Sequence, residues 1–209
     1  MRFLDPAALR AARRIERPPT WYLIENPFQP DAYQALAESY PREGFTTNER
    51  NSGSKKHYRF DVCNLIDHDH RTASLERVAE VWRDFVDFVS GSAYRKALSE
   101  RVGVDLSAAS VSLGLYRYGP GDWVAPHLDK DDKLINQLFY FNTAWDPAWG
   151  GSLEMLSHSD LASSCASLPP VYTHSAIIVR TSQTWHMVKP VASDAPQHRL
   201  SAQLELWAT

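Results

Sequence analysis

The stretch Tyr116-Arg-Tyr-Gly-Pro-Gly-Asp-Trp-Val-Ala-Pro-His-Leu-Asp129 decides the fold of this chain. It reads as short β runs on either side of a Gly-Pro-Gly turn, and it ends in a His-x-Asp tripeptide. His186 follows 59 residues after His127, and Arg199 lies 13 residues further on. Two imidazoles and one carboxylate can occupy one face of an Fe(II) ion and leave three positions open. An arginine on a neighbouring strand can hold a dicarboxylate through two parallel hydrogen bonds.

A His-x-Asp tripeptide is a weak signal by itself. About 0.6 such tripeptides are expected by chance from this composition, and a second one stands at His158-Ser-Asp160. The surroundings separate the two, because His127 is framed by apolar β runs whereas His158 lies in a Ser-rich stretch. We therefore interpret His127 as a ligand candidate and His158 as a loop residue.

Further motifs follow His127 in a fixed order. They are Leu134-Ile-Asn-Gln-Leu-Phe-Tyr-Phe-Asn142, Trp149-Gly-Gly-Ser-Leu-Glu154, Thr184-Trp-His-Met-Val-Lys-Pro-Val191 and Arg199-Leu-Ser-Ala-Gln-Leu-Glu-Leu-Trp207. Their order closely resembles that of the Fe(II)/2-oxoglutarate-dependent dioxygenases of the prolyl-hydroxylase type, over about residues 111–208. Several linked motifs in the right order are far more specific than any one of them.

The resemblance implies an α+β fold with a double-stranded β-helix, or jelly-roll, core. N-terminal helices are then expected to pack on the outside of one sheet. We expect one domain over residues 1–209, with mainly helical support and substrate loops in 1–108 and the catalytic jelly roll in 109–209.

The resemblance also assigns roles to four residues of the metal and co-substrate site. His127, Asp129 and His186 should hold Fe(II), and Arg199 should pair with the distal carboxylate of 2-oxoglutarate. Related halogenases have Gly or Ala at the position of Asp129 and bind chloride there. The carboxylate therefore favours hydroxylation, or another oxidation without halide.

Three more residues match the co-substrate pocket of the family. Ser201 fits the family's Arg-x-Ser, and Tyr140 fits its Tyr-Leu-Asn motif, where Phe141 replaces Leu. Tyr118 fits the tyrosine that precedes the Gly-rich turn. The alternative for each tyrosine is core packing with a satisfied hydroxyl. Gly150 and Gly151 are expected to permit a tight turn rather than to contact ligand.

The implied activity is that of an enzyme that uses Fe(II), 2-oxoglutarate and O₂, with ascorbate as a stimulating reductant. The co-substrate is decarboxylated to succinate and CO₂ while an unactivated C–H is hydroxylated. We expect a small-molecule substrate such as an amino acid or a specialised metabolite. Two alternatives stay open, namely a hydroxylase of protein side chains and a non-catalytic jelly-roll module that binds a small acid.

Composition limits the binding partners and the cellular compartment that we expect for this protein. The net charge of −3 gives no global basic field for nucleic acid, and no apolar run of 18 residues is present to cross a membrane. Cys63 and Cys165 make a poor disulfide framework, so we expect a reducing, cytoplasmic location. The Arg-rich start of the chain leaves an organellar transit peptide as an alternative.

The first half of the chain is predicted to be mainly helical. A short strand is expected at residues 21–24, and a helix from Pro30 to Pro41. Residues 42–59 are polar and predict a loop. Apolar residues at helical spacing predict the strongest helix at 74–89 and a further helix at 93–102. The Ser/Ala-rich stretch 157–170 is expected to be irregular.

The last strand alternates between apolar and polar residues. Arg199, Ser201, Gln203 and Glu205 share one face. This polar face either meets water or lines a pocket, and the resemblance favours the pocket. Three further polar groups are candidate substrate or metal contacts, each with a plain surface loop as the alternative: residues 44–61, His68-Asp-His70 and Lys130-Asp-Asp-Lys133.

Overall fold

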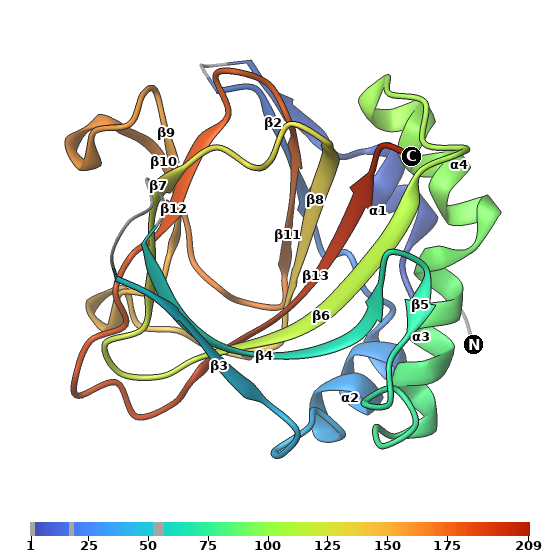
Figure 1. Cartoon of the computed structure of the whole chain (residues 1–209), viewed down its shortest axis with the longest axis horizontal. Helices are drawn as coiled ribbons and strands as arrows, with labels where there is room; N and C mark the ends of the chain where they lie inside the picture. Colours follow the sequence, from blue (N-terminus) through green and yellow to red (C-terminus); the bar gives the residue numbers. More distant parts are fainter. Residues whose placement is uncertain (1–2, 17–18, 52–56) are drawn as a thin grey trace.

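The computed structural model describes residues 3–16, 19–51 and 57–209 (Figure 1). Its helices are α1 (Pro6–Arg10), α2 (Pro30–Glu38), α3 (Glu80–Ser90) and α4 (Ser92–Val102), with 3₁₀ turns η1 (Pro147–Trp149) and η2 (Leu161–Ser163). Its strands are β1 (Arg13–Ile15), β2 (Trp21–Glu25), β3 (Thr46–Arg50), β4 (Tyr58–Asp67), β5 (His70–Arg71), β6 (Ser110–Tyr118), β7 (Trp123–His127), β8 (Lys133–Tyr140), β9 (Leu153–Leu156), β10 (Ser164–Leu168), β11 (His174–Val179), β12 (Trp185–Val188) and β13 (Arg199–Trp207).

The strands form one strongly curled antiparallel sheet with two opposing sides (Figure 1). One side runs β1-β2-β11-β8-β13-β6-β4, and the other runs β7-β12-β9-β10. They are joined where β4 pairs with β7, at Tyr58 opposite Val124. This is the predicted double-stranded β-helix, and its two sides enclose an interior that can hold ligands.

The helices pack on the outer face of the larger side, as the sequence predicts (Figure 1). Trp82 and Phe85 of α3 are fully buried and contact Phe141 and Phe139 at the end of β8. Leu204 of β13 belongs to the same core. The burial of these large side chains fixes one face of the sheet, so the opposite face points into the barrel.

Three element boundaries differ from the prediction. The segment 74–79 forms turns rather than the start of α3, because Ala79 has an extended backbone, although Leu75 and Val78 are buried as their spacing suggested. Residues 46–50 form strand β3, whose side chains are all exposed and so give no apolar alternation. Residues 164–168 form β10, an outer strand with four exposed or half-buried residues. Lys55 and Lys56, within the predicted loop, lie outside the described residues.

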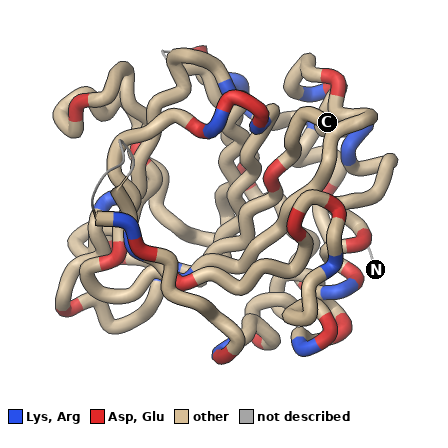
Figure 2. The backbone as a smooth tube through the Cα atoms, in the orientation of Figure 1, with Lys and Arg blue, Asp and Glu red and all other residues tan. Residues whose placement is uncertain are grey.

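Strands from the first half of the chain complete the barrel. β2 pairs with β11, and β4 pairs with β6 and β7, so residues before position 109 belong to the same sheet as the predicted catalytic core. No helix in the described part of the chain is long and apolar enough to cross a membrane. Lys and Arg are interspersed with Asp and Glu along the chain (Figure 2).

Candidate active site

The two histidines of the predicted metal site face each other across neighbouring strands. His127 ends β7 and lies in register with His186 of β12, with ring centroids 4.1 Å apart. Asp129 follows β7 directly, and its Oδ2 is 3.8 Å from Nε2 of His186. All three side chains are buried, and one ligand atom from each lies within 4.8 Å of the others. Two imidazoles and one carboxylate at this spacing can hold a single divalent ion.

Backbone carbonyls fix how the two imidazoles are presented. Nδ1 of His127 is 2.9 Å from the carbonyl of Ala125, and Nδ1 of His186 is 2.9 Å from that of Thr184. A carbonyl oxygen only accepts, so each Nδ1 carries the proton that it donates. This leaves Nε2 of each ring as the nitrogen for a metal, which is the usual way in which protein structure orients a histidine ligand.

Asp129 is held from two directions. Nε of Arg180 donates to its backbone carbonyl at 2.9 Å, and Nζ of Lys133 donates to its Oδ1 at 2.9 Å. Lys133 also donates to Oε1 of Glu205 at 2.5 Å. Burial by itself would lower the pKa of Lys133, but the two carboxylates outweigh it and the pKa is raised. Lys133 is therefore a buried cation at neutral pH.

Arg199 is a buried cation at the inner end of the site. It is 0% exposed, and its guanidinium lies between the rings of Tyr118 and Tyr140, at 4.6 and 5.2 Å from their centroids. Nε donates to the carbonyl of Gly151 at 2.9 Å, and Nη1 donates to Oγ of Ser201 at 3.1 Å. Cross-strand register explains this grouping, since Arg199 lies opposite Tyr118, and Ser201 opposite Tyr140.

The surroundings of Arg199 lack an anion. None of the carboxylates in residues 3–16, 19–51 and 57–209 forms an ion pair with it. Its Nη2 and the hydroxyl of Tyr140 are buried without a hydrogen-bond partner among these residues. A buried charge without a counter-ion is costly, so this end of the site fits the carboxylate of a bound ligand.

Two connected cavities surround these groups. An interior pocket of about 80 Å³ is lined by the metal triad together with Tyr118, Asn136 and Gln203. A cleft of about 460 Å³ leads to it and shares Phe60, Tyr116, Asp129, Lys133 and Glu205 with it. Arg50, Tyr58, Lys130 and Trp207 also line the cleft. Tyr118 lines the interior pocket and packs against Arg199, so it connects the three candidate ligands with the buried guanidinium.

The structure brings together every residue that the sequence predicts for the site: His127, Asp129 and His186, and Tyr118, Tyr140, Arg199 and Ser201. It separates His158 from them. His158 is exposed in the turn before η2, where its Nδ1 accepts from the backbone of Asp160 at 3.3 Å.

His68 does not belong to a metal cluster found among the described residues. Its ring packs against Trp207 with centroids 5.0 Å apart, and its Nδ1 is 3.3 Å from Oγ of Ser110. His70 is exposed.

Gly150 and Gly151 form the predicted tight connection. Both have positive φ, and a Cβ on Gly150 would meet the carbonyl oxygen of Pro190 at 2.1 Å. The carbonyl of Gly151 nevertheless accepts a hydrogen bond from Arg199, so this turn also positions the guanidinium.

Asn136 lines the pocket, and the sequence analysis did not single it out. Glu205 lies on the polar face of β13 that the alternation placed with Arg199. Lys133 belongs to the charged segment named as a candidate contact, but the sequence assigned it no role, because a lysine in a charged turn is usually exposed.

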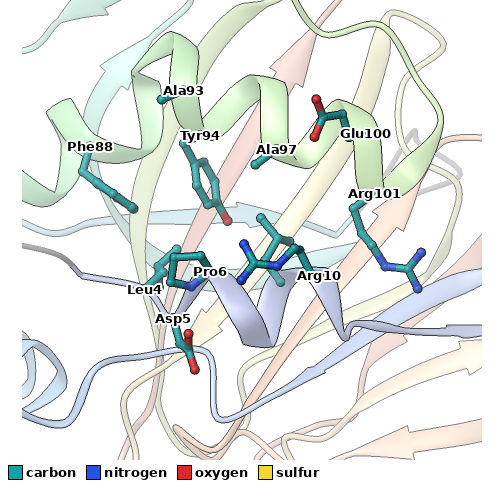
Figure 3. A pocket seen from close by; sticks show the side chains of 11 residues that line it. Leu4, Asp5, Pro6, Arg10, Phe88, Ala93, Tyr94, Ala97, Glu100 and Arg101 are labelled. Carbon is teal, nitrogen blue, oxygen red and sulfur yellow. The ribbon is translucent and has the colours of Figure 1, made fainter.

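A larger groove of about 520 Å³ lies on the outer layer, away from this site (Figure 3). It runs between α1 and α4, where Tyr94 and Ala97 face Pro6 and Arg10 (Figure 3). None of the residues that line this groove also lines the interior pocket or the cleft.

The fold and site together define a non-haem Fe(II) oxygenase built on a double-stranded β-helix. Residues 113–207 match the family model of the 2OG-Fe(II) oxygenase superfamily. The match covers 95 of the 209 residues, and together with the fold it indicates a dioxygenase that uses Fe(II), 2-oxoglutarate and O₂.

Solved structures support the prolyl-hydroxylase type of fold. A Pseudomonas putida prolyl-4-hydroxylase is 22% identical with a TM-score of 0.63, covering 90% of this chain and 92% of that one. A Trichoplax adhaerens prolyl hydroxylase in complex with a hypoxia-inducible-factor peptide is 16% identical with a TM-score of 0.61, covering 90% and 83%. The epimerase SnoN from nogalamycin biosynthesis is 13% identical with a TM-score of 0.59, covering 98% and 84%. A search of curated proteins gives no match.

Proposed function

We propose that this oxygenase hydroxylates an unactivated C–H of a small molecule, such as an amino acid or a specialised metabolite, with release of succinate and CO₂. The observation that carries the proposal is the pairing of a buried 2-His-1-carboxylate group with a buried arginine that lacks a counter-ion. The two lie on the inner face of one barrel, as a keto dicarboxylic acid would need.

In this proposal His127, Asp129 and His186 hold Fe(II), and Arg199 binds the distal carboxylate of 2-oxoglutarate. Nη2 of Arg199 and the hydroxyl of Tyr140 are the groups available to that carboxylate, and Ser201 fixes the other guanidinium nitrogen. When bound, Fe(II) and 2-oxoglutarate supply the oxidising chemistry. The residues of the chain bind and orient the reactants and exclude water from them.

The tyrosines act as neutral hydrogen-bonding groups in this arrangement. Burial raises the pKa of Tyr118 to about 12, although the nearby guanidinium of Arg199 opposes the shift. Burial also raises the pKa of Tyr140, again against the effect of Arg199. Both hydroxyls therefore stay protonated at neutral pH, so Tyr140 can donate to a carboxylate without adding a negative charge.

The cleft supports a polar small molecule as the substrate. Its volume of about 460 Å³ falls in the usual range for small-molecule sites. Its lining includes the cation of Lys133 beside the carboxylate of Glu205, together with the indole of Trp207. A zwitterion such as an amino acid carries charges of both signs that match these two groups.

A hydroxylase of protein side chains is the second candidate. It is favoured by the likeness to prolyl hydroxylases, one of which is in complex with a peptide. The complete triad supports catalysis over a non-catalytic binding module. The shared sheet supports one domain over residues 1–209, and Cys63 and Cys165, which are not joined in a disulfide, support a reducing, cytoplasmic location.

Anaerobic reconstitution with Fe(II) and 2-oxoglutarate tests the proposal. We expect a weak visible charge-transfer band from the chelate, which His127→Ala or His186→Ala abolishes because three ligands leave no spare. His158→Ala is the matched control, and it should keep the band. Loss of the band in His158→Ala but not in His127→Ala would show that the wrong tripeptide was chosen. Succinate release with amino acids and with proline-containing peptides then distinguishes the two substrate classes.

A further inference from the structure

Lys133 places a buried ammonium group between two carboxylates, at the point where the interior pocket meets the cleft. Its side chain is 7% exposed, and its Nζ contacts Oδ1 of Asp129 and Oε1 of Glu205. Burial removes most of the water around a lysine ammonium group, and the two carboxylates offset the cost of that lost hydration.

This contact divides the two oxygens of Asp129. Oδ1 is 2.9 Å from Nζ of Lys133, whereas Oδ2 is 3.8 Å from Nε2 of His186. We propose that Lys133 is a positioning residue that keeps Asp129 a one-oxygen ligand of the metal. The inference rests on the proposed function, because it takes Asp129 to be a ligand.

The number of oxygens that Asp129 uses decides how many metal positions stay open. Carboxylates bind metals through one oxygen or through both. In a six-coordinate ion, two-oxygen binding by Asp129 would fill a position that the co-substrate or O₂ needs. To bind through Oδ1 as well, Asp129 would have to give up a charge-assisted hydrogen bond to a buried ammonium group.

Glu205 balances the positive charge of Lys133. Without Glu205, the ammonium group would cancel the negative charge with which Asp129 attracts the metal. Glu205 lies on the same face of β13 as Arg199, six residues further along. One strand therefore carries the arginine for the distal carboxylate and the support for the metal ligand.

A local irregularity of the sheet turns Lys133 inward. Asn136, Leu138 and Tyr140 of β8 face the interior, so strict alternation would point Lys133 the other way. The register between β8 and β13 shifts between Leu206 and Trp207, and Trp207 is the partner of Lys133. Such a shift re-aims a side chain next to a site.

The test counts the water molecules that Mn(II), used as a probe for Fe(II), carries in the protein. Their number follows from water-proton relaxation, which does not depend on turnover. The variants are Lys133→Met and the double variant Lys133→Met/Glu205→Gln, which leaves no unpaired buried charge. Lys130→Met is the control, because it removes a cation from the same turn whose ammonium group lies over the ring of Trp207.

If Asp129 binds through one oxygen, a six-coordinate ion keeps about three water molecules, and the double variant should keep about two. The relaxivity per bound Mn(II) should then fall by about one third in the double variant and stay unchanged in Lys130→Met. Equal relaxivity in the double variant and the unmodified protein would overturn the proposal. The proposal would also be overturned if the relaxivity fell in Lys133→Met but returned to the unmodified value in the double variant. In that case the added metal ligand would be Glu205 and not the second oxygen of Asp129. Failure of the unmodified protein to bind Mn(II) more tightly than His127→Ala would instead refute the metal site itself.

Discussion

Replacement of Arg199 by Met should remove most of the binding of 2-oxoglutarate. The guanidinium is fully buried, and Nη2 and the Tyr140 hydroxyl have no partner among the described residues until a carboxylate arrives. Loss of one member of a buried charge pair costs about 2–5 kcal/mol. At about 1.4 kcal/mol per tenfold change, the Kd should rise roughly 30-fold to several thousand-fold.

Arg199→Lys should recover only part of this loss. A lysine keeps the charge, but it cannot donate to Gly151, to Ser201 and to a carboxylate in the fixed directions of a guanidinium. Its Kd should therefore lie between those of Arg199→Met and the unmodified protein.

Arg117→Met is the matched control. Arg117 lies on β6, opposite the neighbour of Arg199 in β13, but its side chain is on the outer face and contacts Asp61 at 2.7 Å. Its removal should leave the Kd for 2-oxoglutarate unchanged.

An anaerobic titration that follows the charge-transfer band measures the Kd, and thermal melting gives a second readout. Ligand at 100 times its Kd stabilises the folded state by about 2.7 kcal/mol. For a chain of this size that corresponds to a rise in Tm of roughly 5–10 °C. Arg199→Met should melt cooperatively without ligand and show no rise. If it titrates like the unmodified protein, Arg199 does not hold the co-substrate.

Two further predictions concern the reaction and the pH dependence of stability. As a proposed metal ligand, Asp129 would fill the position that a halide needs, so turnover in chloride or bromide buffer should give no halogenated product. Asp129→Gly should weaken metal retention. Chlorinated product from the unmodified protein, detected by mass spectrometry, would remove Asp129 from the triad. Burial would raise the pKa of Glu154, but hydrogen bonds from Ser152, Ser164, Ser167 and Lys189 outweigh it and lower the pKa below 4.5. The contribution of Glu154 to stability is then present above pH 4.5 and lost as the pH falls through the lowered pKa. Between pH 7 and 3, the Tm should therefore fall more steeply for the unmodified protein than for Glu154→Gln. Parallel plots of Tm against pH for the two proteins would contradict this.

The register of the strands explains why the residues predicted for the site lie together. Arg199 and Ser201 were placed on one face by alternation alone, because side chains of a strand point to opposite sides at every second residue. The prediction for α3 was less accurate at its start, since Leu75 and Val78 are buried by turns that have the same apolar spacing as a helix. Strand β3 was missed because its exposed residues carry no periodic burial.

The motifs along the chain are enough to indicate the chemistry of this protein. His127, Asp129, His186 and Arg199 stand in motifs whose order identifies the family, and donor type alone limits what they can bind.

The other charges around those residues could be identified only once the strands were placed relative to one another. Lys133 lies in a charged turn that could equally have met water, and the register shift opposite Trp207 brings it into the barrel, between Asp129 and Glu205. The physical reason is distance along the chain. Local sequence fixes backbone preference and apolar spacing, whereas Lys133 and Glu205 are 72 residues apart and meet only because the strands that carry them pair.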